Sequence, residues 1–124
     1  MIYIAHPLRG DVEGNKKKVT EIMQGILEKE ILAISPVHAF GYVDPEGPQR
    51  RVMTECIRLL ERCTDLWVYG DAESIRNSTG VVTEIAYARA VGIPVTFKNE
   101  DTARAMEQSE KRIITRTNSG GEVI

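Results

Sequence analysis

The apolar positions of this chain follow two periods, one typical of short buried strands and one typical of amphipathic helices. Short apolar runs predict strands at residues 1–5, 31–35, 65–70 and 93–97. Apolar residues at helical spacing predict helices at residues 12–30, 49–63, 78–91 and 102–111. Residues 112–116 predict a fifth, edge strand, and the glycines, prolines and polar residues of segments 37–48 and 71–77 predict loops.

Strands that alternate with helices predict right-handed βαβ units and therefore a parallel sheet. We expect an α/β fold with a doubly wound, flavodoxin-like or Rossmann-like sheet of four to five strands. In such sheets ligands bind beyond the carboxyl ends of the strands. The loops at residues 6–11, 37–48 and 70–80 are predicted to meet at that edge, so the chemistry is expected there.

The chain has 124 residues, enough for one domain, which we place at residues 1–117 with a flexible tail at 118–124. Its 16 Lys and Arg and 18 Asp and Glu give a formal net charge of −2, which argues against a nucleic-acid polymer or a membrane surface as partner. The run Lys16-Lys17-Lys18 is interpreted as the solvated face of a helix. The chain lacks both a membrane-spanning apolar stretch and the basic opening of a signal peptide, so we expect a cytoplasmic protein.

The cysteines and histidines do not predict a disulfide or a metal site. Cys56 and Cys63 lie two helical turns apart, which separates their Cα atoms by ~10 Å, too far for a disulfide. We interpret both as core thiols. The two histidines, His6 and His38, add no ligand spacing, so we expect neither a metal nor a cofactor.

The most informative stretch is the turn and helix from Ser78 to Glu84, with the sequence Ser-Thr-Gly-Val-Val-Thr-Glu. Ser78 is a predicted N-cap, and the free N–H groups and positive dipole of a helix start suit a phosphate. A carboxylate held near such a site can attack an electron-poor sugar carbon. The stretch indicates a nucleotide-directed enzyme, with an ordinary solvated glutamate as the alternative.

Three segments together resemble the nucleoside 2-deoxyribosyltransferase superfamily, and within it the 2'-deoxynucleoside 5'-phosphate N-hydrolases. The segments are Tyr3-Ile4-Ala5 with Leu8-Arg9-Gly10, then Asp65-Leu66-Trp67-Val68-Tyr69, then Ser78-x-Gly80-Val81-x-x-Glu84 with Ala86-Tyr87-Ala88 and Gly92-Ile93-Pro94-Val95. The segment Pro36-Val37-His38-Ala39-Phe40 is also similar to small phage and prophage proteins of that superfamily.

The resemblance implies a sheet of order 2-1-3-4-5 and a homodimer or larger homo-oligomer with sites near subunit boundaries. It implies that Glu84 is the nucleophile at C1' of the sugar and that Tyr3 holds this carboxylate by a hydrogen bond. It further implies that Ser78 contacts the 5'-phosphate and that Arg9 and Gly10 form a phosphate-binding turn.

Other residues are candidates for binding on their own chemistry. Gly80 lets a phosphate approach the backbone closely, and the fork of Arg9 can bind two phosphate oxygens. His38 is a candidate to stack on a base or hydrogen-bond it, and His6 is a weaker candidate of the same kind. The structural alternatives are a surface arginine and two loop histidines.

One position departs from the pattern of the superfamily. The superfamily has an aspartate eight residues before the aspartate that begins the third strand, where this chain has Ile57. Either Glu55 or a loop acid such as Asp44 or Glu46 replaces it, or the usual chemistry has been lost.

The sequence thus predicts an N-glycosidase or 2-deoxyribosyltransferase-like enzyme that cleaves the N-glycosidic bond of a nucleoside 5'-monophosphate or a related nucleotide. One alternative is a nucleotide-binding protein without turnover, a sensor or a sequestering protein of phage origin. Another is a structural module with a vestigial crevice.

Overall fold

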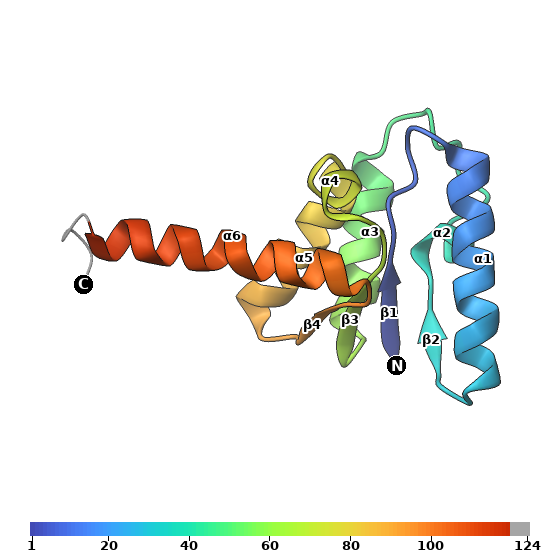
Figure 1. Ribbon diagram of the computed structural model, residues 1–124. Coiled ribbons are helices and arrows are strands. Elements are labelled where there is room, and N and C mark those ends of the chain that lie inside the picture. The colour runs from blue at the N-terminus through green and yellow to red at the C-terminus, as the bar shows by residue number, and fades with distance from the viewer. Residues whose placement is uncertain (120–124) are drawn as a thin grey trace.

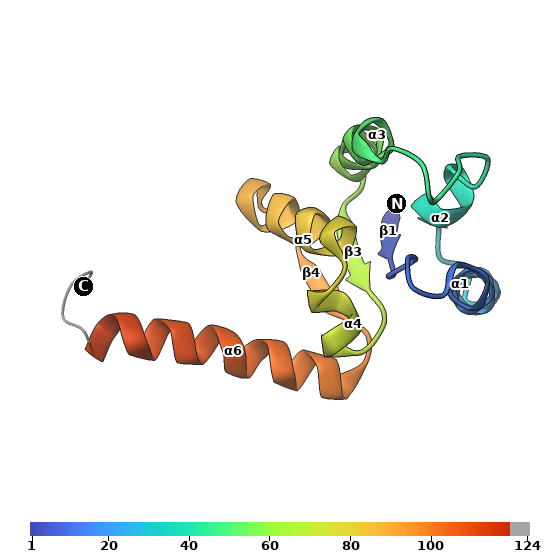
Figure 2. The same cartoon turned by 90° about the horizontal axis from the view of Figure 1, so that it is seen from above.

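The computed structural model describes the backbone of residues 1–119 and the side chains of residues 1–109. Four parallel strands form one sheet with helices on both faces (Figures 1 and 2). The elements in chain order are β1 (Ile2–Ala5), α1 (Val12–Glu28), β2 (Ala33–Ile34), α2 (Pro36–Ala39), α3 (Arg50–Glu61), β3 (Asp65–Val68), α4 (Ala72–Arg76), α5 (Thr79–Val91), β4 (Val95–Phe97) and α6 (Glu100–Ser119).

The strand order is β2-β1-β3-β4, which confirms the predicted doubly wound α/β sheet. β1 is central, and its Ile2 pairs with Ala33 of β2 on one side and with Asp65 of β3 on the other. The chain leaves β1 toward β2 and leaves β3 toward β4, so the order reverses between β1 and β3. Because every pair is parallel, the carboxyl ends of these two central strands open at one edge, where such sheets bind ligands.

The main core lies on the face of the sheet covered by α3 and α5 (Figure 2). Period-two alternation sends Tyr3 and Ala5 of β1 and Leu66 and Val68 of β3 to this face. They pack against buried residues of α3, α4 and α5, among them Leu60, Ile75, Val81, Ile85 and Ala88. On the other face α1 contributes the buried residues Val19 and Ile26.

The prediction of a fifth strand at residues 112–116 is wrong, because these residues belong to α6. Asn99 starts this helix by accepting a hydrogen bond from the Thr102 N–H at 3.1 Å. No glycine or proline interrupts the sequence from there to Gly120, so the helix continues through the β-branched pair Ile113-Ile114. α6 extends away from the sheet (Figure 1), and residues 120–124 of the expected tail lie outside the described residues.

Two segments predicted as loops contain short helices. Pro36 supplies the first turn of α2, where its missing N–H costs nothing. α4 begins after Asp71, whose carboxylate accepts hydrogen bonds from the Ser74 N–H at 2.8 Å and the Ser74 hydroxyl at 2.9 Å. The second strand is shorter than predicted and covers only residues 33–34.

The backbone turn after β3 depends on Gly70. Its φ of 115° lies in the region that favours glycine, and a Cβ there would lie 3.3 Å from Pro7 Cδ. We expect Gly70→Ala to lower the free energy of unfolding by about 1–3 kcal/mol. Gly25, inside α1 with open space around it, is the matched control, and Gly25→Ala should raise that free energy by about 0.5–1 kcal/mol. Urea denaturation measures both, and an unchanged stability of Gly70→Ala would contradict the prediction.

Candidate active site

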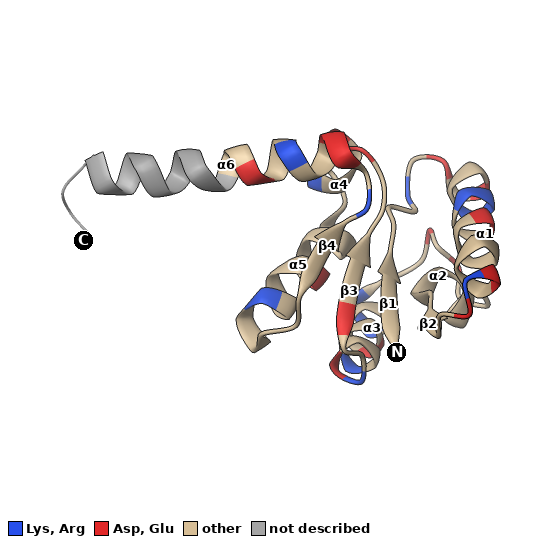
Figure 3. Ribbon diagram, turned by 60° about the horizontal axis from the view of Figure 1, so that its bottom comes forward, with Lys and Arg blue, Asp and Glu red and all other residues tan. Residues whose placement is uncertain are grey.

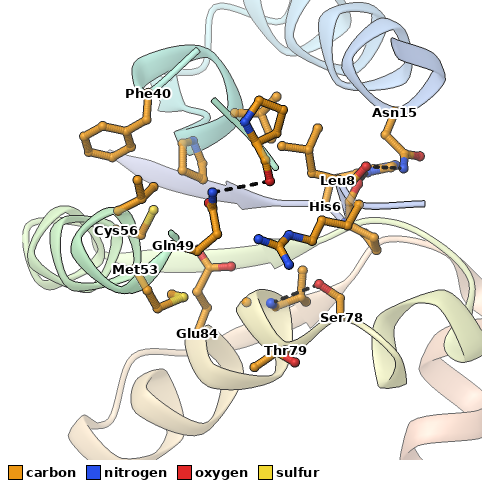
Figure 4. Close-up of a pocket in the computed structure, with 18 of the residues that line it drawn as sticks. His6, Leu8, Asn15, Phe40, Gln49, Met53, Cys56, Ser78, Thr79 and Glu84 are labelled. Carbon is orange, nitrogen blue, oxygen red and sulfur yellow. Dashed lines mark hydrogen bonds between the residues drawn. The ribbon is translucent and has the colours of Figure 1, made fainter. Parts of the chain in front are cut away.

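A cleft of about 830 Å³ opens at the carboxyl edge of the sheet (Figure 4). Its walls are the loop after β1, the start of α1, the α2–α3 region, and the segment from Gly70 into α5. The three loops that the sequence predicted to meet here therefore do meet. The lining changes from apolar side chains such as Phe40 and Met53 on one side to basic and polar side chains on the other.

Glu84 is a buried carboxylic acid in this cleft. Val81, Ile85 and Ala88 form the apolar side of α5 that packs on the sheet, and Glu84 lies on the same side by helical spacing. Its exposed fraction is only 5%. Figure 4 shows its side chain pointing into the cleft. A glutamate on a core-facing side of a helix needs a partner, because burial without one is costly.

Tyr3 supplies that partner. Its side chain is fully buried on β1, and its hydroxyl donates a hydrogen bond to Glu84 Oε2. No protein donor reaches Oε1 within the described residues, and none of their fully buried polar atoms lacks a partner. Oε1 is therefore the oxygen that is accessible from the cleft, while Oε2 accepts the hydrogen bond from Tyr3.

Burial controls the protonation of this pair. It raises the pKa of Glu84 to about 7, because the ionised carboxylate loses water, and the hydrogen bond from Tyr3 partly opposes the rise. Burial, together with the charge of Glu84, also raises the pKa of Tyr3, so its hydroxyl remains a donor. A carboxyl group whose pKa is near neutrality is typical of a functional site.

Cys56 of α3 lies beside the pair, with its side chain buried at the wall of the cleft (Figure 4). Burial and the charge of Glu84 raise the pKa of this thiol to about 11. Cys56 is therefore a protonated, weakly nucleophilic neighbour of Glu84. The interpretation of both cysteines as buried free thiols is confirmed.

The N-terminus of α5 provides backbone donors to the same cleft. Ser78 caps the helix, as predicted, and its hydroxyl accepts a hydrogen bond from the Val81 N–H at 3.3 Å. Within the described residues the N–H groups of Thr79 and Gly80 donate to no protein acceptor. Both residues line the cleft, so these two donors and the helix dipole are available to an anion.

Basic side chains also line the cleft. Arg9 comes from the loop after β1, Lys16 and Lys18 come from α1, and Arg50 begins α3. None of the four forms an ion pair with a described carboxylate. The carboxylates that line the cleft are Glu84 and Asp71. The positive excess favours an anionic ligand.

The side chain of Gln49 fastens the end of the α2–α3 loop to the residues just before it. Its side-chain amide donates to the carbonyl oxygens of Asp44, Pro45 and Gly47, at 3.0, 3.3 and 2.8 Å. Arg9 Nη2 also lies 3.5 Å from the Gly47 oxygen. This fastened loop, which we call the strap, borders the cleft with its Val43 and Pro45.

The structure brings most of the candidate residues together. Glu84, Arg9, Ser78, Gly80 and His6 line one cleft, with Tyr3 directly behind Glu84. Gly10 does not line it, and its φ of 98° serves the turn that follows Arg9.

His38 is placed outside the cleft lining, whereas its neighbour Phe40 lies inside it. One ring nitrogen of His38, Nε2, lies 2.9 Å from Thr20 Oγ1, and Nδ1 lies 3.3 Å from Ser35 Oγ. The histidine therefore links α2 to α1. His6, the other histidine predicted to contact the base, does line the cleft, and its Nδ1 lies 2.6 Å from the Pro7 oxygen.

No second acid stands beside Glu84 in the described part of the chain. Ile57 packs against the main core, and Glu55 pairs with Arg51 at 3.0 Å and with Arg58 at 3.4 Å. The loop acids Asp44 and Glu46 do not line the cleft. Asp71 does, but its hydrogen bonds with Ser74 lower its pKa and keep it ionised.

The sequence did not predict the roles of Lys16, Lys18 and Gln49. The lysine run was interpreted as one solvated face, yet Lys16 and Lys18 line the cleft and Lys17 does not. The spacing of Asn15 and Lys18 could have indicated that both face the cleft, since residues three apart lie on the same side of a helix. Nothing in the sequence pattern indicates that Gln49 fastens a loop. 

The described residues contain no group of three or more histidine, cysteine or acidic side chains placed to hold a metal ion. Their helices also include none with the length and apolar character that a membrane span needs.

The buried carboxyl group predicts a pH-dependent stability. In the unfolded chain Glu84 ionises near its ordinary pKa of 4.5, whereas in the folded protein it ionises near 7. The free energy of unfolding therefore falls as the pH rises between these values. Glu84→Gln is neutral and still accepts from Tyr3, so it should be more stable than the native protein by about 1–3 kcal/mol at pH 8 and nearly equal at pH 4.5.

Urea denaturation at the two pH values measures this difference. Glu21→Gln is the matched control, since Glu21 is exposed in the middle of α1, and it should show no such pH dependence. A stability of Glu84→Gln that is equal to the native value at pH 8 would contradict a buried carboxylate at this position.

Comparison with known protein families identifies the family to which this chain belongs. Residues 1–98, from the first residue to the residue after β4, match the model of a family described as "Domain of unknown function (DUF7768)". No curated protein and no solved structure matches the chain. The matched segment contains every residue that lines the cleft and covers more than half of the chain. The protein is therefore a member of the DUF7768 family.

Proposed function

We propose that this protein is an N-glycosidase or 2-deoxyribosyltransferase-like enzyme that acts on a nucleoside 5'-monophosphate or a related nucleotide. The observation that carries the proposal is the position of Glu84. Its buried carboxyl group is held by Tyr3 and shares one cleft with Arg9 and the free N–H groups at the start of α5. The resemblance of these segments to the nucleoside 2-deoxyribosyltransferase superfamily agrees with this chemistry.

In the proposed reaction Glu84 Oε1 attacks C1' of the sugar. The bond between C1' and the base nitrogen breaks, and the base leaves with the electron pair. A covalent glycosyl-enzyme results, as in other glycosyl transfers with a carboxylate nucleophile. Water, or a second base, then attacks C1', and the carboxylate is released with net retention at C1'.

Tyr3 positions the nucleophile because its hydroxyl holds Oε2 and leaves Oε1 directed to the cleft. The hydrogen bond also favours the ionised form that the attack requires. The 5'-phosphate would lie against the Thr79 and Gly80 N–H groups, with Arg9 opposite. The base would occupy the apolar side of the cleft, beside Phe40 and Met53.

The proposal predicts base release that depends on ionised Glu84. Incubation with nucleoside monophosphates, followed by chromatography, should detect free base, and the kcat/KM of its release should rise with pH through a midpoint at about 7. Glu84→Gln should lower kcat on the order of a thousandfold or more, because the nucleophile is lost.

Tyr3→Phe is the diagnostic companion variant. Removal of the hydroxyl takes away a hydrogen bond that lowers the pKa of Glu84, so the rise of kcat/KM should move to higher pH. Glu28→Gln is the control, since Glu28 is exposed on α1 and lines neither this cleft nor the neighbouring groove, and it should keep the native profile. Base release that Glu84→Gln leaves intact would remove the assignment of the nucleophile.

A second candidate is a nucleotide-binding protein without turnover, acting as a sensor or a sequestering protein. The observation that favours it is the absence of a second acid beside Glu84 in the described residues, with Ile57 packed in the core and Glu55 held by two arginines. The same assay separates the candidates, because in this case calorimetry would detect binding of a nucleotide that stays intact throughout the incubation.

A further inference from the structure

A second groove continues from the cleft along the carboxyl edge of the sheet. Its volume is about 510 Å³, and its lining includes Tyr69 after β3 and Lys98 after β4. His6, Lys18 and Gly70 line both the cleft and this groove. The two cavities therefore meet at a saddle made by these three residues.

The wall of the cleft leads toward this saddle. From the start of α5 it runs back through Asn77, Ser74 and Asp71 to Gly70. Gly70 cannot carry a side chain without strain, since its φ is 115° and a Cβ would crowd Pro7. A Cβ here would meet the side chains of Pro7 and Ile75, so the glycine lets the backbone after β3 lie close to the loop after β1 where the two cavities border each other.

Basic side chains line both cavities, and together they provide more positive charge than one phosphate needs. Arg9 and the two free N–H groups at the start of α5 suffice for a single phosphate. Lys18 lies at the saddle and Lys98 in the groove, and neither forms an ion pair with a described carboxylate. Figure 3 shows basic positions at this edge, on the loop after β1 and on α1.

The other charged and titratable groups along the path do not cancel this excess. Glu21 is the carboxylate of the groove, and Asp71 is bound by Ser74. Burial and the charge of Lys18 lower the pKa of His6, so His6 adds no charge at neutral pH. The Lys98 ammonium group lies 4.1 Å from the centre of the Trp67 ring, which holds it at the groove.

We infer that the groove beyond the His6–Gly70 saddle binds the distal phosphates of a nucleoside 5'-diphosphate or triphosphate, with Lys18 and Lys98 as their cationic partners. The inference rests on the proposed function and names its substrate class. The phosphate next to the sugar lies at the start of α5, and the following phosphates cross the saddle into the groove.

Binding of nucleotides that differ only in phosphate number tests this inference. Calorimetry on Glu84→Gln, which prevents turnover, compares the 2'-deoxynucleoside 5'-mono-, di- and triphosphates of one purine and one pyrimidine without divalent cations. We expect the Kd of the triphosphate to be at least about tenfold below that of the monophosphate, since added charge-assisted contacts contribute that much.

Lysine variants made in the same background locate the effect. Lys98→Gln should remove most of the advantage of the triphosphate and leave the Kd of the monophosphate within about twofold of its original value, because Lys98 lines only the groove. Lys18→Gln should weaken triphosphate binding by a larger factor than monophosphate binding, because Lys18 lines both cavities. Lys17→Gln is the matched control, because Lys17 neighbours Lys18 on α1 but lines neither cavity, and it should change neither Kd.

The outcomes separate this inference from the proposed function. Monophosphate binding and cleavage without any gain from further phosphates would overturn the inference and leave the proposed function standing. Triphosphate binding that depends on Lys18 and Lys98, with no base released by the native protein, would support the groove and overturn the catalytic proposal. Equal loss in Lys17→Gln and Lys18→Gln would also overturn the inference, because the effect would then be one of general charge.

Discussion

The hydrogen bond between Tyr3 and Glu84 is the interaction on which the cleft depends. It joins the central strand to α5 across the main core, and it is the contact that makes a buried carboxyl group tolerable at Glu84. Burial on a core-facing side of α5 would otherwise favour a neutral side chain. The result is a carboxyl group whose pKa lies near neutrality, with one oxygen held and the other open to the cleft.

The arrangement around that carboxyl group follows from the parallel sheet. Because β1 and β3 are adjacent and the chain leaves them in opposite directions, their following loops separate and leave a crevice between them. The first loop carries Arg9, and the segment after β3 leads to the capped start of α5. A nucleophile, a cation and free backbone donors thus reach one cleft from parts of the chain that are far apart in sequence.

Much of this could be predicted from the sequence, and the failures have physical reasons. The strands and the N-cap at Ser78 follow from local periodicity and turn residues, which the final packing does not oppose. The order of the four strands does not follow from periodicity, and it agrees with the order that the resemblance implies for them. The fifth strand was wrong because β-branched residues at 113 and 114 are a weak signal against an uninterrupted helix. The strap fastened by Gln49 could not be predicted, because nothing in the local pattern marks this side-chain amide as the donor to three nearby carbonyl oxygens. The placement of Lys18 could not be predicted, since the cleft that it lines is formed by segments far apart in sequence.

Chemical trapping of the intermediate tests the central claim most directly. A nucleotide with fluorine at C2' of the sugar slows the reaction by disfavouring positive charge at C1', so a glycosyl-enzyme should accumulate. Mass spectrometry of the intact protein and its peptides should then detect one sugar phosphate attached to the peptide that contains Glu84. Release of the base with no adduct, or with an adduct on another residue, would contradict the account.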